Sequence, residues 1–294
     1  MIKQKRRKLD VLVISDVHLG TYGCKAKELL SYLKTVKPKI LVLNGDIIDI
    51  WQFSKSYFPK SHLKVIKHLT NLLAKGTIIY YVTGNHDEML RKFEGLKLGR
   101  FSIVNKLVLD MNGTKTWIFH GDVFDVVMKN SKWLAKLGGK GYDLLILLNT
   151  FVNWISEKVH GGRLSFSKKI KSGVKSALKF IDDFEQTAID IAGAKGYENV
   201  ICGHIHQPAM RDTITLDGKK VCYMNSGDWV ENMTSLEYAN GEWTIYEFAK
   251  DPIAQNYETT DLISETTLEK ADFAGSRLFQ DLLAEFQMAG LTKN

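Results

Sequence analysis

The apolar positions in the first third of the chain predict alternating strands and helices. Short apolar runs predict buried strands at three places: Leu9 to Ser15, Ile40 to Leu43 and Thr77 to Val82. Between these runs, apolar residues recur at helical spacing over Lys25 to Val36 and over Ser61 to Ala74. Pro38 and Gly76 end the two helices, since proline cannot continue a helix and glycine favours its C-cap. This order predicts parallel strands joined by right-handed crossovers.

The pattern changes to hairpins after residue 100. Ser102 to Asp110 and Lys115 to Phe119 are predicted strands on either side of Asn112-Gly113, a strong turn signal. Five later runs are also predicted strands: Asn199 to Cys202, Met210 to Leu216, Lys219 to Asn225, Ser235 to Ala239 and Glu242 to Phe248. The second half is therefore predicted to be mostly antiparallel, and two strand-rich halves with helices outside indicate an α/β sandwich.

A helical insertion is predicted at about 123–195, inside a single domain spanning 1–250. Two helices separated by the Gly138 to Gly141 breaker fit its strongly apolar first part, Val123 to Gly162. Leu164 to Ala192 continues as a helix with one apolar stripe and one lysine stripe. The remaining 251–294 form a polar C-terminal extension, in which Arg277 to Met288 is a predicted helix.

Five polar clusters follow predicted strands. They are Asp16-Val17-His18, Gly45-Asp46-Ile47-Ile48-Asp49, Gly84-Asn85-His86-Asp87, His120-Gly121-Asp122 and Gly203-His204-Ile205-His206. Ligands of α/β sheets bind at the carboxyl ends of strands, so these clusters belong to one candidate site. Any one cluster alone is a weak signal, because Asp-X-His and His-X-His also occur as ordinary surface or core features. Five at successive strand ends make coincidence improbable.

The residue types in these clusters suit a pair of metal ions. Paired metals need carboxylate and imidazole ligands, with one carboxylate shared between the ions. Asp46 follows a glycine that allows a tight turn, which suits the shared position, and Asn85 supplies a neutral amide oxygen. Alternation along an extended strand end predicts that Asp16 and His18 turn to one face, and likewise His204 and His206.

The ordered motif set, from about Leu9 to Phe248, resembles the calcineurin-like metallophosphoesterase superfamily. The resemblance implies a four-layer α/β sandwich of two mixed β-sheets flanked by helices. It also implies two divalent metal ions, expected to be Mn²⁺ with iron, zinc or magnesium as alternatives. One ion would be held by Asp16, His18, Asp46 and His206, and the other by Asp46, Asn85, His120 and His204.

The same resemblance implies a mechanism in which a metal-bridging hydroxide attacks phosphorus in line with the leaving group. His86 is the predicted catalytic group, stabilising the transition state or protonating the leaving oxygen. Asp87 is predicted with it in the catalytic set, as an orienting carboxylate together with Asp49. Asp122 and Asp228 are either further orienting carboxylates or loop residues.

Composition narrows the protein class. The 294 residues are 45% hydrophobic, enough for a full core, and three scattered cysteines give no disulfide framework. The apolar stretch from Leu144 to Ile155 is interrupted by Asn149 and Asn153, and is too short for a membrane span. We therefore expect a cytoplasmic protein. A net charge of +7 favours anionic partners, which are phosphate groups, an acidic membrane surface or nucleic acid, and an ordinary basic soluble protein is the alternative. Among these partners we expect a small-molecule or lipid-linked phosphoester and no nucleic acid.

Two motifs resemble the corresponding stretches of UDP-2,3-diacylglucosamine pyrophosphatases of lipid A synthesis: His120-Gly121-Asp122 and Gly203-His204-Ile205-His206-Gln207-Pro208. That resemblance implies hydrolysis to 2,3-diacylglucosamine 1-phosphate and UMP, peripheral contact with the inner membrane, and an insertion that covers the acyl chains. Arg163, Ser167 and Lys168 are predicted phosphate or nucleotide contacts. Typical members have arginine where this chain has His86, which puts the substrate in doubt.

Three further readings stay open. The insertion suits a lid over an amphipathic substrate, but equally a helical cap whose apolar face is buried on the core. The protein is alternatively a soluble metallophosphoesterase acting on nucleotides, cyclic phosphodiesters or phosphoproteins. A non-catalytic scaffold of the same fold is the third reading, which the full ligand set disfavours because scaffolds are free to lose ligands.

Overall fold

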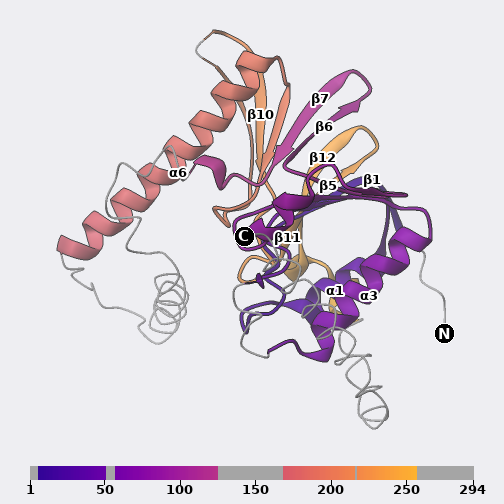
Figure 1. Ribbon diagram of the computed structural model, residues 1–294. Helices are drawn as coiled ribbons and strands as arrows, with labels where there is room; N and C mark the ends of the chain where they lie inside the picture. Colours follow the sequence, from indigo (N-terminus) through magenta and orange to yellow (C-terminus); the bar gives the residue numbers. More distant parts are fainter. Residues whose placement is uncertain (1–5, 51–56, 125–167, 216, 257–294) are drawn as a thin grey trace, which may run out of the picture.

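Two stacked β-sheets form the centre of the computed structural model, which describes residues 6–50, 57–124, 168–215 and 217–256 (Figure 1). The first sheet has the strand order β12-β11-β1-β2-β3-β5-β4. Its strands are β1 (Arg7–Ile14), β2 (Val36–Asn44), β3 (Ile78–Val82), β4 (Lys97–Leu98), β5 (Phe101–Val104), β11 (Thr234–Ala239) and β12 (Glu242–Glu247). Strands β1, β2, β3 and β5 run parallel, and the pairs β1–β11, β11–β12 and β4–β5 are antiparallel.

The second sheet has the order β6-β7-β8-β10-β9. Its strands are β6 (Lys106–Met111), β7 (Thr114–Phe119), β8 (Asn199–Cys202), β9 (Ala209–Ile214) and β10 (Lys220–Asn225). Strand β8 pairs in parallel with both β7 and β10, whereas the outer pairs β6–β7 and β9–β10 are antiparallel. Both sheets are therefore mixed.

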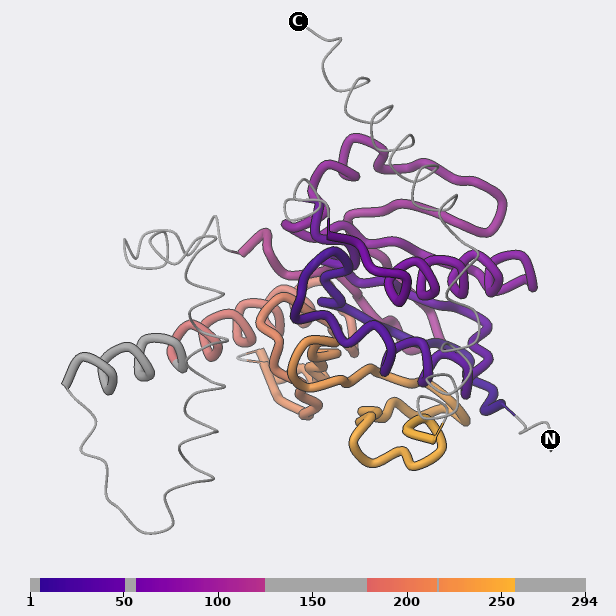
Figure 2. The backbone as a smooth tube through the Cα atoms, turned by 90° about the horizontal axis from the view of Figure 1, so that it is seen from below, coloured from indigo at the N-terminus to yellow at the C-terminus, as the bar shows by residue number. Residues whose placement is uncertain are grey.

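Helices cover the outer face of each sheet. The helices α1 (Ala26–Thr35) and α3 (Lys60–Ala74) lie side by side on the first sheet (Figure 2). The long helix α6 (Lys168–Lys195) packs on the second sheet through Phe184, Ala188 and Ala192. A third apolar cluster, including Val13, Val42 and Ile201, fills the space between the sheets. The layers run helix, sheet, sheet, helix, which confirms the predicted fold.

The predicted strands are confirmed within a few residues, with one exception. Ser102 to Asp110 was expected to be a single strand, but Asn105 divides it into β5 of the first sheet and β6 of the second. The Thr83 hydroxyl donates a hydrogen bond to Asn105 Oδ1 at 2.8 Å, which fixes this crossing point. The prediction of one strand was wrong because an apolar pattern of period two continues unchanged through such a crossing.

Two short elements carry no apolar pattern and were not predicted: the 3₁₀ helix η1 (Glu88–Phe93) and strand β4. A second 3₁₀ helix, η3 (Phe248–Lys250), follows β12. Within the residues that the structure describes, none of the helices combines the length and apolarity needed to span a bilayer. The helices predicted over Val123 to Gly162 and Arg277 to Met288 lie outside the described residues, apart from a helical start at Val123 and Phe124.

Candidate metal centre

The loops after β1, β2 and β8 place the predicted ligands on left-handed backbone. Asp16, His18, Asp46, His204 and His206 have φ of 52°, 54°, 53°, 68° and 54°. Non-glycine residues rarely adopt such angles, and the cost in free energy is of order 1 to 3 kcal/mol each where the conformation is sparsely populated. The side chains thus converge because the chain turns sharply after each strand. Alternation along an extended strand, the reason predicted from the sequence, is not the cause.

Hydrogen bonds between the loops hold this backbone in place. The Asp16 N–H donates to the Gly45 carbonyl at 3.1 Å, and the His18 N–H donates to the Asp46 carbonyl at 2.9 Å. The His204 N–H donates to the Asp16 carboxylate, at 3.1 Å from Oδ2. Three loops that are far apart in sequence are therefore joined directly through the residues expected to bind metal.

Close packing around the carboxylate of Asp46 requires two glycines. A Cβ atom at Gly84 would lie 2.2 Å from Asp46 Oδ1, and one at Gly45 would lie 2.3 Å from His120 Nδ1. Gly45 also has a φ of +80°, in the left-handed region that glycine adopts without strain. Any larger residue at either position would displace a predicted ligand.

The side chains form three overlapping groups whose ligand atoms lie within 4.8 Å of one another. The first group is Asp16, His18 and His206, and the third is Asp46, His120 and His204. The middle group, His18, Asp46 and His86, takes one member from each of them. This arrangement matches two neighbouring metal positions, and it separates His204 from His206 as the sequence predicted.

The donor set fits divalent cations. His120 Nδ1 donates to the Asn44 carbonyl at 2.9 Å, which leaves Nε2 as the coordinating atom. Nε2 lies 3.2 Å from Asp46 Oδ2 but lacks the geometry of a hydrogen bond to it. A buried imidazole nitrogen and a buried carboxylate oxygen are thus held close together as an ion pair, without a hydrogen bond between them. A cation between them would satisfy both atoms.

The charges of these groups support each other. Burial alone would raise the pKa of the Asp46 carboxyl, but the imidazoles of His120, His18 and His86 outweigh burial and hold that pKa well below its usual range. Burial would lower the pKa of His120, but Asp46 outweighs it and raises the pKa well above the usual value. The carboxylate is therefore anionic at neutral pH. A metal ion would compete with protons for the imidazoles, since histidine binds metals in its neutral form.

His86 lies at the edge of this group, where it can meet a substrate. Its side chain is 31% exposed, and Nδ1 lies 3.0 Å from Asp49 Oδ2. The backbone N–H of His86 donates a hydrogen bond to Asp46 Oδ1 at 2.8 Å. Burial lowers the pKa of His86, but the hydrogen bond to Asp49 and the charges of Asp46 and Asp49 outweigh burial and raise that pKa. A proton on this imidazole is thus available near the site.

Asp87 is buried beneath the site and binds other parts of the protein. Its Oδ2 accepts hydrogen bonds from the Ile47 N–H at 3.0 Å and from the Tyr81 hydroxyl at 2.6 Å. Its Oδ1 accepts one from the Gly84 N–H at 2.6 Å. The carboxylate joins two of the site loops to β3, so the structure gives Asp87 a positioning role.

The two remaining carboxylates also hold loops. Asp122 forms an ion pair with Arg91, and Asp228 Oδ1 accepts the Val230 N–H at 2.7 Å. These contacts fit both interpretations of Asp122 and Asp228, as loop residues or as orienting carboxylates.

Of the predicted substrate contacts, Arg163 and Ser167 lie outside the described residues, and Lys168 is described only as the first residue of α6. Asn85 follows Gly84 in the loop that holds Asp87.

Sequence reasoning missed two supporting side chains. The Tyr81 hydroxyl binds Asp87, and His62 Nδ1 accepts the Gly20 N–H at 2.9 Å, just beyond His18. Tyr81 lies within an apolar strand run and His62 within a helix, so neither position carried a signal of its own. The available hint was that Tyr81 and His62 are polar residues at positions where the apolar pattern predicts burial.

Comparisons with known proteins agree with this geometry. A profile of the family described as Calcineurin-like phosphoesterase matches residues 9–208. The chain is 24% identical over 244 residues to the UDP-2,3-diacylglucosamine hydrolase of Aliivibrio fischeri (strain MJ11), covering 81% of this chain and 98% of that protein. It is 26% identical over 264 residues to the protein of the same name from Blochmanniella pennsylvanica (strain BPEN), covering 82% and 100%.

Solved structures resemble the chain more distantly. The phosphoesterase Yfce from E. coli aligns with a TM-score of 0.41 at 12% identity, covering 81% of this chain and 92% of that one. A structure described as a novel archaeal phosphodiesterase aligns with a TM-score of 0.38 at 14% identity, covering 81% and 98%.

The family profile spans the loops after β1, β2, β3, β7 and β8, so all seven predicted metal ligands fall within it. The match and the grouped aspartates and histidines together support binding of divalent metals. On these grounds the chain belongs to the calcineurin-like phosphoesterase family.

Proposed function

We propose that this protein hydrolyses a phosphoester or pyrophosphate bond with the help of two divalent cations, for which Mn²⁺ is the first candidate. The family and the named relatives indicate a hydrolase. The observation that carries the proposal is the sharing of residues between the ligand groups. Asp46 belongs to the third group and, together with His18 of the first group, to the middle group, so its carboxylate lies between the two proposed metal positions, where a bridging ligand is needed.

The protein's own residues would divide the work. Asp16, His18 and His206 would hold one cation, and Asp46 would join it to a second held by Asn85, His120 and His204. Two such cations supply a water of lowered pKa and neutralise charge on phosphoryl oxygens. His86, oriented by Asp49, would hold a proton for the departing oxygen. Asp87 would keep the loops of Ile47 and Gly84 at a fixed separation.

We infer that the substrate is UDP-2,3-diacylglucosamine, cleaved by water at its pyrophosphate to give 2,3-diacylglucosamine 1-phosphate and UMP. Support comes from the names of the relatives, which are matched over most of their length, and from the net charge of +7. Such a substrate would be met at the cytoplasmic face of the inner membrane. Arg163, Ser167 and Lys168 remain predicted contacts for its phosphate or nucleotide part.

A substrate panel tests the proposal. Purified protein with Mn²⁺ is offered UDP-2,3-diacylglucosamine in detergent, a set of nucleotides, a cyclic phosphodiester and a phosphopeptide, with Asp46→Asn as the inactive control. We expect hydrolysis of the lipid-linked pyrophosphate at a kcat/KM at least about tenfold above the soluble compounds. Equal or faster turnover of a soluble phosphoester would replace the lipid substrate with that compound. No turnover of any phosphoester would refute catalysis.

A further inference from the structure

Arg91 and Asp122 form an ion pair between two loops of the candidate metal centre. Arg91 lies in η1, which begins directly after Asp87. Asp122 lies two residues after the predicted ligand His120, and its Oδ2 accepts a hydrogen bond from Nη2 of Arg91. The pair therefore holds a guanidinium against the loop that supplies His120.

Both loops are fixed close to the predicted ligands. The Leu90 N–H donates to the Asp87 carbonyl at 2.9 Å, which holds η1 to the loop before it. On the other side of the pair, a Cβ atom at Gly121 would lie 3.3 Å from the Cβ of His204. The loop that carries the acidic partner thus packs directly on a second predicted ligand. The ion pair therefore lies beside the third ligand group.

The guanidinium of Arg91 has donors that Asp122 does not use. Among the residues that the structure describes, Asp122 is the one hydrogen-bond acceptor for this side chain, although a guanidinium carries several N–H donors. Nε is shielded from solvent and has no hydrogen-bond partner in that part of the chain. The Arg91 side chain is nevertheless 34% exposed, whereas that of Asp122 is 9% exposed. A nearly buried carboxylate thus holds a cation that a ligand can still reach.

The alternative is that this pair only ties the two loops together. A partly exposed ion pair contributes little stability, and a buried N–H donor without a partner costs more than such a pair gains. A lysine would tie the loops without burying a donor of this kind. An acceptor supplied by a ligand would satisfy Nε, so the tie between loops does not by itself account for Arg91.

We propose that Arg91, positioned by Asp122, determines specificity by binding the second phosphate of a pyrophosphate substrate, next to the phosphorus that water attacks. This inference rests on the proposed function and deepens it. The fork of a guanidinium matches two oxygens of a phosphate group, so it can bind both at once. A phosphodiester with a single phosphorus has no second phosphate for this contact. Arg91 therefore favours pyrophosphates over such phosphodiesters.

The contact also acts on the bond that breaks. Water, which gives up one proton to solvent, forms a bond to the attacked phosphorus. The bond from that phosphorus to the bridging oxygen breaks, and its electron pair stays on the second phosphate. The bridging oxygen takes the proton held by His86, while the guanidinium of Arg91 stabilises the negative charge of the departing phosphate.

The test compares two substrates that differ in the number of phosphorus atoms. Turnover is measured with Mn²⁺ on UDP-2,3-diacylglucosamine and on bis(p-nitrophenyl) phosphate, a chromogenic phosphodiester. In Arg91→Gln we expect kcat/KM to fall at least about tenfold on the pyrophosphate and by less than about twofold on the phosphodiester. Equal losses on both substrates would mean that the pair only ties the loops together, and would overturn the proposal.

Two further variants separate the contact from charge and from folding. Lys92→Gln makes the same charge change at an exposed neighbouring position of η1, and should leave both activities unchanged. Arg91→Lys keeps a cation for Asp122 but lacks the fork, so we expect wild-type stability in urea and restoration of only part of the pyrophosphate turnover. Complete restoration by lysine, or a loss in Lys92→Gln as large as that in Arg91→Gln, would contradict the assignment.

A binding measurement tests the contact without turnover. Calorimetry compares UMP with α,β-methylene-UDP, which adds a second phosphorus through a methylene link that water does not cleave. We expect the preference for the two-phosphorus compound to fall at least about fivefold in Arg91→Gln and to be unchanged in Lys92→Gln. An unchanged preference in Arg91→Gln would refute the contact.

The failures of the two proposals are distinguishable. If no phosphoester is hydrolysed, the proposed function fails, and the binding preference still decides the role of Arg91. Turnover of the phosphodiester but of no pyrophosphate would refute the role of Arg91 and leave phosphoester hydrolysis in place.

Discussion

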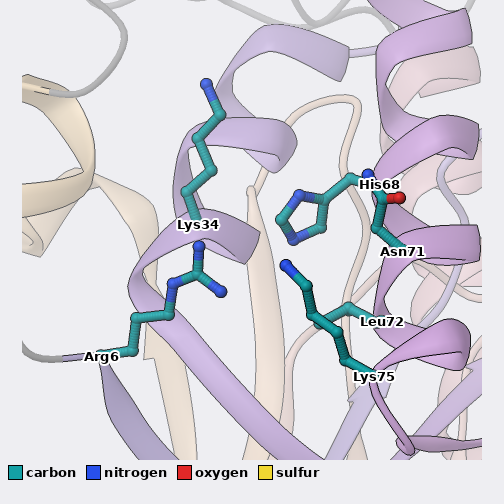
Figure 3. Close-up of a pocket in the computed structure, with 6 residues that line it drawn as sticks. All are labelled: Arg6, Lys34, His68, Asn71, Leu72 and Lys75. Carbon is teal, nitrogen blue, oxygen red and sulfur yellow. The ribbon is translucent and has the colours of Figure 1, made fainter.

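The two ends of strands β1, β2 and β3 both collect charged side chains, but with opposite sign and different rigidity. At the carboxyl ends, Asp16 and Asp46 are buried on left-handed backbone among histidines. At the amino ends, Arg6 just before β1 and Lys75 at the C-cap of α3 line a surface pocket (Figure 3) and are exposed. The same parallel pairing brings three loops together at each end, so the chemistry of the loops decides what each end can bind.

The rigidity of the carboxyl end indicates its task. Hydrogen bonds between loops fix the carboxylates, as the one from the His204 N–H to Asp16 does. Positions fixed in this way suit metal ions, whose ligands must keep short and definite distances.

The largest expected effect is that of Asp46→Asn, which removes the carboxylate charge at the predicted bridging position. Asparagine tolerates the left-handed backbone at this position, so the fold is retained. We expect metal content to fall from two ions per chain to one or none, and turnover to fall on the order of a thousandfold or more. Metal analysis and kinetics measure both. Asp183→Asn, an exposed change on α6, is the control, and two retained metals with normal turnover would contradict the bridging role.

His86→Gln should separate metal binding from proton transfer. The imidazole lies at the edge of the ligand groups, so we expect two metals to remain while kcat falls by about 10² to 10⁴. Metal content and the pH dependence of kcat are the measurements. Loss of a metal in step with activity would instead make His86 a ligand of the middle group.

Asp87→Ala should destabilise the carboxyl end without changing any predicted ligand. It leaves the Ile47 N–H, the Gly84 N–H and the Tyr81 hydroxyl without their acceptor. We expect the free energy of unfolding to fall by at least about 3 kcal/mol, since each buried donor without a partner costs about 1 to 3 kcal/mol. Urea unfolding measures it, with Asp183→Ala for comparison. A loss below about 1 kcal/mol would show that these bonds are replaced.

Asp49→Asn should act through His86. Burial lowers the pKa of His86 and Asp49 raises it, so removing the carboxylate lowers that pKa. A proton that must be held for the leaving group is then lost at lower pH. We expect the alkaline limb of the rate profile to move to lower pH, with a loss of rate of about tenfold. An unchanged limb would mean that a group other than His86 supplies the proton.

The smallest expected effect is at the amino end. Lys75→Gln removes one of several neighbouring cations, so the free energy of unfolding should rise slightly at low salt, by less than about 0.5 kcal/mol. Added salt or phosphate should abolish this gain, because both screen or neutralise the remaining charges. Urea unfolding at low and high salt, with Lys67→Gln alongside, measures it. A loss of stability at low salt would show that Lys75 is not under repulsion.

The sequence was sufficient to predict the fold, because apolar positions repeat with one period in strands and with another in helices. It could not place the boundary at Asn105, where the chain changes sheet without changing its pattern. It identified the polar residues at the strand ends by type and order. It did not predict the left-handed backbone of His18 and Asp46, because such angles arise from hydrogen bonds between distant loops.

The cationic pocket at the amino ends of the strands was also not predictable from the sequence. Arg6, Lys34 and Lys75 are common residue types, each alone near the end of an element. No pattern in the sequence connects them, and they come together only through the parallel pairing of β1, β2 and β3. The role of Tyr81 was not predictable either, because its hydroxyl lies at a buried strand position and only the structure shows that it donates a hydrogen bond to Asp87.

We propose that the carboxyl end of this sheet holds two cations joined by Asp46. Anomalous scattering from crystals grown with Mn²⁺ tests it directly. We expect two peaks about 3.5 to 4 Å apart, one within bonding distance of Asp16, His18 and His206 and the other of Asn85, His120 and His204, with Asp46 within bonding distance of both. A single peak, or two peaks that do not share Asp46, would contradict it.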